Sequence, residues 1–180
     1  MKIYCATSNP GKLREFRLAA PDFEIVPVSL PAPEETGKTF EENALLKARY
    51  YGTHVDGYLF VDDSGIEVDA LGGRPGVDSA QFDNDWLLEQ LRGIENRTAR
   101  FVCVIALVRN AELVKMFRGD VEGLVTEAPR GANGFGYDPV FFYEPFGCTF
   151  GEADTDAKMK VSHRAKALDA MFTFLRSASI

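Results

Sequence analysis

The sequence predicts an α/β protein built on a long mixed β-sheet flanked by helices. In the first half of the chain, apolar strand-like runs alternate with amphipathic helical segments, as in strand–helix units. In the second half, two apolar runs at 99–108 and 113–118 flank Asn110-Ala111-Glu112, a pattern that favours a long β-hairpin. The 180 residues contain no internal repeat and no convincing linker, so we expect a single domain spanning 1–180.

The chain is expected to begin with a strand, a helix and a second strand. Residues 3–6 read as the first strand. In the turn that follows, Asn9 is suited to cap a helix and Pro10 to occupy its first position. A short second strand is expected at 23–28, and the loop after it, at 27–37, is rich in Pro and Glu.

A stronger helix is expected from about residue 40. Thr39 and Glu42 have the spacing of a capping box, in which each residue satisfies an amide at the start of the helix. Asn43 and Lys47 are four positions apart, so they share one face of this helix.

The remaining elements are shorter until the end of the chain. A strand is expected at 65–70, and a short amphipathic helix at 85–92. After the hairpin, a glycine-rich loop at 131–136 precedes the apolar run 140–142. The last helix is expected to start near Ser162.

Composition restricts the function. The net charge of −7 and the pI near 4.9 argue against a general nucleic-acid binder, which would show a broad basic surface. No run is long and apolar enough to span a bilayer, and the N-terminus reads as a strand rather than a signal peptide. Cys5, Cys103 and Cys148 are odd in number and lack metal-site spacing, so we expect reduced thiols in a cytoplasmic protein.

Two adjacent carboxylates, Asp62 and Asp63, are the most informative feature. They follow the apolar run Tyr58–Val61, so we expect them at the exposed end of a strand, where alternation turns one side chain away from the other. Carboxylates in this position are common magnesium ligands and water-activating bases. Asp-Asp-Ser-Gly is also good turn chemistry, so the pair alone does not separate a site from a surface turn.

Four further segments favour phosphate and base binding, although each also fits a purely structural interpretation. Thr7–Lys12 opens a helix, where backbone amides and a lysine attract phosphate, but it is not a P-loop. Glu34 could reach a metal that Asp63 also holds, while Lys47 meets a phosphate and Asn43 positions water or metal. The third segment is an aromatic loop that suits base stacking, Phe135-Gly136-Tyr137-Asp138. The fourth combines a lysine with a helix start and suits a carbonyl oxygen or a phosphate; it consists of Lys158 and Ser162-His163-Arg164.

Taken together and in order, these segments resemble the inosine triphosphate pyrophosphatase family, the XTP/dITP diphosphatases that cleanse nucleotide pools. The resemblance spans nearly the whole chain. It rests on seven stretches: Thr7–Lys12, Glu34–Gly37, Phe40–Lys47, Asp62–Gly65, Ala70–Gly76, Gly134–Pro139 and Ser162–Arg164. Two departures are small, because Ser8 and Ala165 stand where many members have glycine and neither changes a charge.

The resemblance implies a two-lobed α/β fold with a nucleotide cleft between the lobes, usually as a homodimer. It implies Mg²⁺-dependent hydrolysis of a purine nucleoside triphosphate (ITP, dITP or XTP) to the monophosphate and pyrophosphate. By matching position, Glu34 and Asp63 would hold the metal, with Asp63 also the catalytic base. The matched positions for phosphate are Thr7, Ser8, Asn9, Pro10, Gly11, Lys12, Lys47 and Ser64. Phe135 would stack on the base, and Gly136 and Tyr137 follow it in the same base-binding stretch. The polar edge of the base would meet Asp138, Lys158, His163 and Arg164.

Other functions remain open from the sequence. A Maf-type pyrophosphatase acting on modified pyrimidine nucleotides would differ in base preference, and a nucleotide sensor would bind without releasing pyrophosphate. RNA binding is disfavoured by the acidic balance. A Ser-His-Asp hydrolase using Ser64 and His163 is disfavoured because the chain has no G-x-S-x-G elbow.

Overall fold

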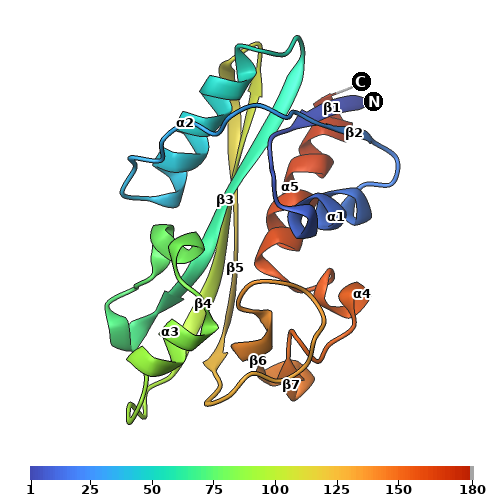
Figure 1. Ribbon diagram of the computed structural model, residues 1–180. Coiled ribbons are helices and arrows are strands. Elements are labelled where there is room, and N and C mark those ends of the chain that lie inside the picture. The colour runs from blue at the N-terminus through green and yellow to red at the C-terminus, as the bar shows by residue number, and fades with distance from the viewer. Residues whose placement is uncertain (179–180) are drawn as a thin grey trace. The chain divides into compact units, whose positions relative to one another are not determined.

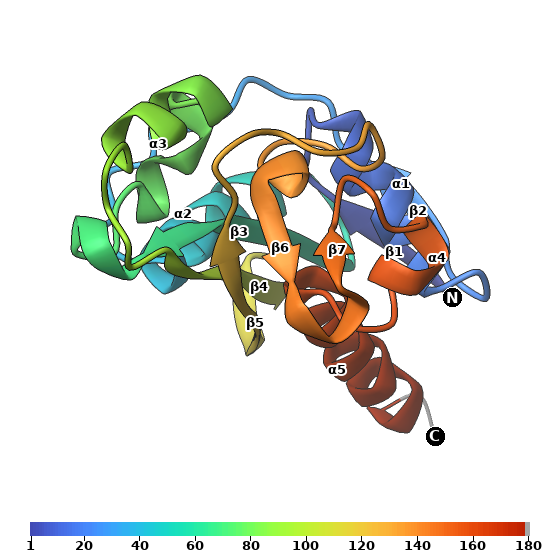
Figure 2. The ribbon, with the colours of Figure 1, turned by 90° about the horizontal axis from the view of Figure 1, so that it is seen from below.

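The computed structural model describes residues 1–178, which form a seven-stranded sheet with the order β2-β1-β3-β4-β5-β6-β7 (Figure 1). β1 is parallel to β2 and β3, whereas β6 is antiparallel to β5 and β7, which Figure 2 shows beside it. The sheet is therefore mixed, and the predicted fold class is confirmed. The strands are β1 Lys2–Cys5, β2 Glu24–Pro27, β3 Tyr58–Val68, β4 Thr98–Arg109, β5 Glu112–Val125, β6 Phe141–Tyr143 and β7 Cys148–Thr149.

The helices begin where the sequence places their caps. Asn9 accepts hydrogen bonds from the amides of Gly11 (2.9 Å) and Lys12 (3.2 Å), and Pro10 is the first helical residue, as predicted. The helices are α1 Pro10–Ala19, α2 Phe40–Gly52, α3 Asn84–Gln90, α4 Thr155–Lys158 and α5 His163–Ala178. Within residues 1–178, these helices are too short or too polar to cross a membrane.

The capping box of α2 differs in one bond. The Thr39 hydroxyl accepts from the Glu42 amide at 3.1 Å, as expected. The Glu42 carboxylate accepts from the amide of Lys38, at 2.6 Å, rather than from that of Thr39. Because the Glu42 side chain bonds to Lys38, one residue before the cap, it connects the preceding loop to the helix.

By its contacts the chain divides into two compact units. The first comprises residues 1–63, 103–119 and the described chain from Arg164, and the second comprises 64–102 and 120–163. In the first unit, the ring of Phe60 packs against those of Phe16 (centroids 4.9 Å apart) and Phe172 (6.1 Å). In the second unit, Phe141 packs against Phe101 (4.2 Å) and Phe150 (5.2 Å). Each unit thus has its own buried aromatic core.

The prediction that Asp62 and Asp63 lie at the exposed end of a strand is wrong. β3 continues from Tyr58 to Val68 and carries the two aspartates in its interior, where both are buried. The local preference of Asp-Asp-Ser-Gly for a turn is overridden because the two carboxylates are neutralised inside the strand, by Lys12 and Arg164 at Asp62 and by Lys47 at Asp63. Gly65 fits within the strand because its missing Cβ leaves room for the Gly76 carbonyl and the Ser79 hydroxyl.

The predicted hairpin is confirmed and is longer than expected. β4 and β5 are joined at Asn110 (φ 50°) and Ala111 (φ 65°), both left-handed, as a two-residue turn between right-twisted strands requires. The strand expected at 65–70 is the C-terminal part of β3, followed by a 3₁₀ turn at Asp69–Leu71. The other predicted elements shift by only a few residues at their ends.

Candidate functional site

Asp62 and Asp63 point to opposite faces of β3, as alternation along a strand requires. Asp62 contacts Lys12 at the start of α1 and Arg164 at the start of α5, whereas Asp63 contacts Lys47 of α2. Within this unit, Figure 1 shows α1 and α5 on one side of β3 and α2 on the other. The prediction that the pair divides between two surroundings is confirmed.

Asp62 is the anionic centre of a buried network. Its Oδ1 lies 3.0 Å from Lys12 Nζ, and its Oδ2 lies 3.2 Å from Arg164 Nε. The Cys103 thiol donates to Oδ2 at 3.8 Å, and Arg164 is also bonded to Glu15 at 2.7 Å. Burial alone would raise the pKa of Asp62, but the nearby cations outweigh it and hold that pKa well below its usual range.

Asp63 has one oxygen engaged and one left over. Lys47 Nζ donates to Oδ1 at 2.8 Å and to the Asp62 carbonyl at 3.2 Å, whereas Oδ2 is buried without a hydrogen-bond partner. Burial raises the pKa of Asp63 despite the lowering effect of Lys47. A buried carboxylate oxygen with no donor suits a cation or a water proton.

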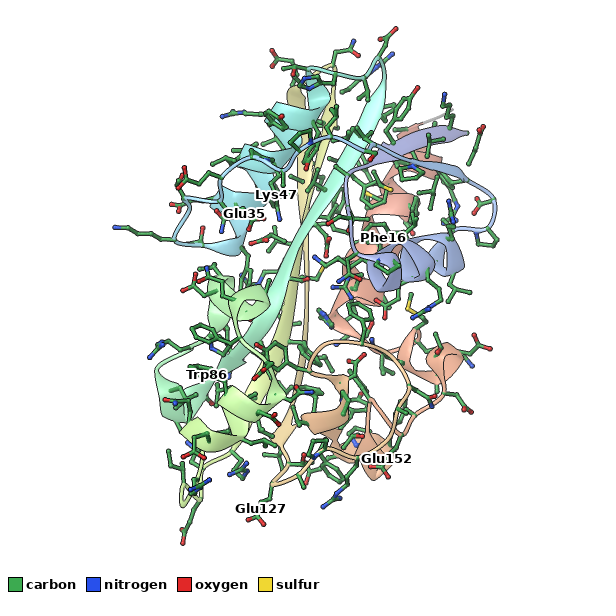
Figure 3. The ribbon with its side chains drawn as sticks, viewed as in Figure 1. Phe16, Glu35, Lys47, Trp86, Glu127 and Glu152 are labelled. Atoms are coloured by element: carbon green, nitrogen blue, oxygen red, sulfur yellow. The ribbon has the colours of Figure 1, made fainter. Side chains whose placement is uncertain are left out.

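The loop acids of the predicted metal site are placed unequally. Glu35 Oε1 lies 3.1 Å from Lys47 Nζ, and Figure 3 shows the two side chains facing each other. Lys47 therefore joins Glu35 to Asp63. Glu34 is exposed, and the structure of residues 1–178 gives it no hydrogen bond or ion pair.

The donor set fits Mg²⁺ bound in part by substrate. No group of three or more His, Cys, Asp or Glu side chains that could hold a metal occurs among residues 1–178. Mg²⁺ is usually held by one or two carboxylates together with substrate phosphates and waters, so Asp63 and one loop acid are a sufficient protein contribution. The free oxygen of Asp63 is the observation that supports this fit.

In the predicted phosphate loop at Thr7–Lys12, some of the backbone amides are already bonded to the side chain that caps α1. The Asn9 side chain takes the amides of Gly11 and Lys12, and the Asn9 amide donates to the Thr7 hydroxyl at 3.1 Å. Ser8 is exposed, as is Pro10. Lys12 reaches Asp62, so the structure joins this loop to the carboxylate network.

The second unit gathers the predicted base-binding residues around Asp138. Asp138 Oδ2 accepts from Lys158 Nζ at 2.7 Å and from the Phe135 amide at 2.9 Å. The Lys158 ammonium lies 4.9 Å from the centre of the half-buried Phe135 ring and 6.0 Å from that of Phe150. Gly134 has φ +71°, and a Cβ there would meet the Asp138 carboxylate.

The loop that carries Phe135 is fixed from its other side. The Tyr137 hydroxyl lies 2.7 Å from the Ser79 carbonyl and 3.0 Å from that of Phe82. The Asn84 side-chain amide donates to the Gly136 carbonyl at 3.2 Å. These contacts hold the loop before any ligand binds.

Three other predicted residues take different surroundings. Ser64, half-buried in β3, belongs to the second unit. His163 is buried there, and its ring stacks on Phe101 with centroids 4.7 Å apart. Arg164, predicted at the polar edge of the base, has its guanidinium bonded to Asp62 and Glu15 in the first unit.

Sequence reasoning missed Glu15 and the part that Cys103 takes in the network. Glu15 is 2% exposed and holds Arg164. Its signal was available, because Glu15 follows Lys12 by three residues and therefore shares its face of α1. Cys103 gave no signal beyond its burial, since its contact with Asp62 depends on strand pairing.

The chain is similar to known proteins over nearly its whole length. The Ham1 family matches residues 3–174. A dITP/XTP pyrophosphatase of Symbiobacterium thermophilum is 48% identical, over 93% of this chain and 91% of its own. One from Acidobacterium capsulatum is 40% identical, over 97% of this chain and 98% of its own.

Solved structures agree in fold. A HAM1 protein from Coxiella burnetii superposes with a TM-score of 0.88 at 36% identity, covering 98% of this chain and 99% of that one. The nucleoside-triphosphatase (dITP/XTP pyrophosphatase) from Mycobacterium abscessus gives 0.73 at 40% identity, covering 95% and 98%. The match in both sequence and fold over nearly the whole length shows that this chain belongs to the Ham1 family.

Proposed function

We propose that this chain hydrolyses the non-standard purine nucleoside triphosphates dITP, ITP and XTP to the monophosphate and pyrophosphate, with residues 1–180 acting as one catalytic domain. The observation that carries the proposal is the buried Asp63, fixed by Lys47 and left with one free oxygen. Relatives matched over nearly their whole length are dITP/XTP pyrophosphatases, which supports this activity over the Maf-type and sensor alternatives.

The residues of the first unit would carry out the phosphate chemistry. Asp63 Oδ2 would accept a proton from the water that attacks the α-phosphorus, with pyrophosphate as the leaving group. Lys12 and Lys47 would neutralise charge on the phosphates, and their ion pairs with Asp62 and Asp63 would keep the two ammonium groups oriented. Mg²⁺, held by Asp63 and an acid of the Glu34–Glu35 segment, would neutralise phosphate charge when bound.

The residues of the second unit would read the base. Phe135 would stack on the purine, and a base stacked on an aromatic ring gains roughly 1–3 kcal/mol. Lys158 carries only donors, so it suits the 6-oxo acceptor of hypoxanthine or xanthine and not the 6-amino donor of adenine. Its pairing with Asp138 would keep it oriented.

The enzyme is also proposed to be a cytoplasmic homodimer. The three free cysteines support a reducing compartment. The apolar side chain of Leu113 on β5 is 42% exposed and is the position at which we test a second copy as partner. Light scattering of the wild type should give twice the mass of one chain. Leu113→Arg should lower the measured mass toward that of a single chain.

The activity is tested by measuring pyrophosphate and phosphate release from ITP, XTP, GTP, ATP and dTTP with Mg²⁺. Pyrophosphate from ITP and XTP, with little from the others, supports the proposal. Release from modified pyrimidine nucleotides alone would favour the Maf-type activity. Tight ITP binding without release would favour a sensor.

A further inference from the structure

The loop between β2 and α2 is attached to α2 through a few side chains. Residues 28–39 form no regular secondary structure; of the loop's candidate metal ligands, Glu34 is exposed and the Glu35 side chain is 38% exposed. A segment of this kind does not hold a carboxylate in a fixed place by itself, because its backbone retains many conformations. The side chains that contact this loop at Glu35, Gly37 and Lys38 all come from α2.

Asn43 makes the most buried of these attachments. Its side chain is 2% exposed, and its Oδ1 accepts a hydrogen bond from the Gly37 amide at 2.7 Å. The loop backbone lies so close that a Cβ on Gly37 would be 2.5 Å from this oxygen. The path of the chain at Gly37 is thus defined by the Asn43 side chain.

Lys47 makes a second attachment one turn further along the same face of α2. Its Nζ lies 3.1 Å from Glu35 Oε1 and 2.8 Å from Asp63 Oδ1. The loop is therefore held at Glu35 by a charge and at Gly37 by an amide, with a single residue between. The two contacts together set where the Glu34–Glu35 segment runs relative to Asp63.

We propose that Asn43 is a positioning residue for a divalent cation. It acts through Gly37 to hold the Glu34–Glu35 carboxylates near Asp63, and so it completes the cation site without touching the ion. This inference rests on the proposed function, which assigns the cation to Asp63. It gives a physical route for the expectation from the sequence that Asn43 positions water or metal.

The test measures Mn²⁺ binding to the nucleotide-free protein by electron paramagnetic resonance, together with amide hydrogen exchange. Asn43→Ala should raise the Mn²⁺ dissociation constant by about 2- to 10-fold, the value of one hydrogen bond, and speed exchange across 34–38. Asn43→Asp keeps the acceptor oxygen and should restore slow exchange and tight binding. In assays, Asn43→Ala should raise the half-saturating Mg²⁺ concentration by a larger factor than it lowers kcat.

Glu42→Ala is the matched control. It removes the neighbouring bond from Glu42 to the Lys38 amide, on the same loop and the same turn of α2, at an exposed position. It should speed exchange at Lys38 and leave Mn²⁺ affinity unchanged. Should Asn43→Ala fail to fold, Asn43→Ser shortens the same side chain with less change in polarity.

Two results would overturn the inference alone. One is wild-type Mn²⁺ affinity in Asn43→Ala despite faster loop exchange, and the other is an equal loss of affinity in Glu42→Ala. Asp63→Asn separates these from a failure of the proposed site. If Asp63→Asn binds Mn²⁺ as the wild type does, the cation does not lie at Asp63, and both proposals fall.

Discussion

Arg164 Nε lies 3.2 Å from Asp62 Oδ2, although the two residues are 102 positions apart in the sequence. Their side chains are 3% and 1% exposed, so the pair is almost completely removed from water. Lys12 shares the same carboxylate at 3.0 Å. One buried anion thus joins the starts of α1 and α5 to β3, while its neighbour Asp63 keeps an oxygen free for chemistry.

Asp62→Asn should mainly destabilise the fold. Removing one member of a buried ion pair leaves the partner charges uncompensated, which typically costs about 3–5 kcal/mol. The free energy of unfolding in urea, measured for the variant and the wild type, checks this. An unchanged urea midpoint would mean that Asp62 does not stabilise the cations around it.

Asp63→Asn should mainly remove activity. Loss of a general base costs about 10²–10⁴-fold in rate. Lys47 keeps Glu35 as a counter-ion, so the loss of stability should be smaller than for Asp62→Asn. Urea unfolding should therefore show the smaller loss of stability for Asp63→Asn, while pyrophosphate release should show a large loss of rate for this variant. A turnover near that of the wild type would reject Asp63 as the base.

Gly65→Ala should destabilise the second unit. The new Cβ would meet the Gly76 carbonyl and the Ser79 hydroxyl, and Ser79 also accepts from the Ile66 amide at 2.9 Å. Overpacking of this kind costs about 1–3 kcal/mol. The midpoint of thermal unfolding measures this loss of stability. Ser64→Ala serves as the comparison, because Gly57→Ala would add strain at a positive φ.

Tyr137 should make stability fall at alkaline pH. Burial raises the pKa of Tyr137 from its usual value of 10.0 to about 12. The folded state therefore holds the phenolic proton more tightly than the unfolded state, so this contribution is complete below pH 10 and is lost as the pH rises toward 12. Tyr137→Phe should lower the unfolding free energy by about 0.5–1.5 kcal/mol at neutral pH and flatten its decline in this range. Urea midpoints across the range measure both effects, and parallel declines would contradict the assignment.

The three cysteines should differ in reactivity. Burial raises the pKa of Cys5 to about 12 and that of Cys103 further, so neither forms much thiolate at neutral pH, whereas Cys148 is partly exposed. Iodoacetamide should therefore label native Cys148 first, and all three after unfolding. Peptide mass spectrometry identifies the sites, and early labelling of Cys103 would show that β4 opens readily.

Local signals were sufficient for most elements. The caps at Asn9 and Thr39 and the turn at Asn110 each depend on a few neighbouring residues, and the structure confirms them. The exposed strand end predicted at Asp62 and Asp63 is wrong because the same local signals favour a turn at Asp-Asp-Ser-Gly. The cations that keep β3 continuous come from α1, α2 and α5.

The sequence by itself determined the fold class, the helix starts, and the two aspartates as the centre of the candidate site, because short-range patterning and capping chemistry are written in adjacent residues. Only the tertiary structure decided that Asp62 is shared by Lys12 and Arg164 and that Glu15 holds Arg164. It also decided that Lys47, which contacts Asp63, is paired with Glu35 rather than Glu34. These are choices among several acids and several cations. They depend on which side chains burial brings within ion-pair distance, since charges interact strongly only where water is excluded.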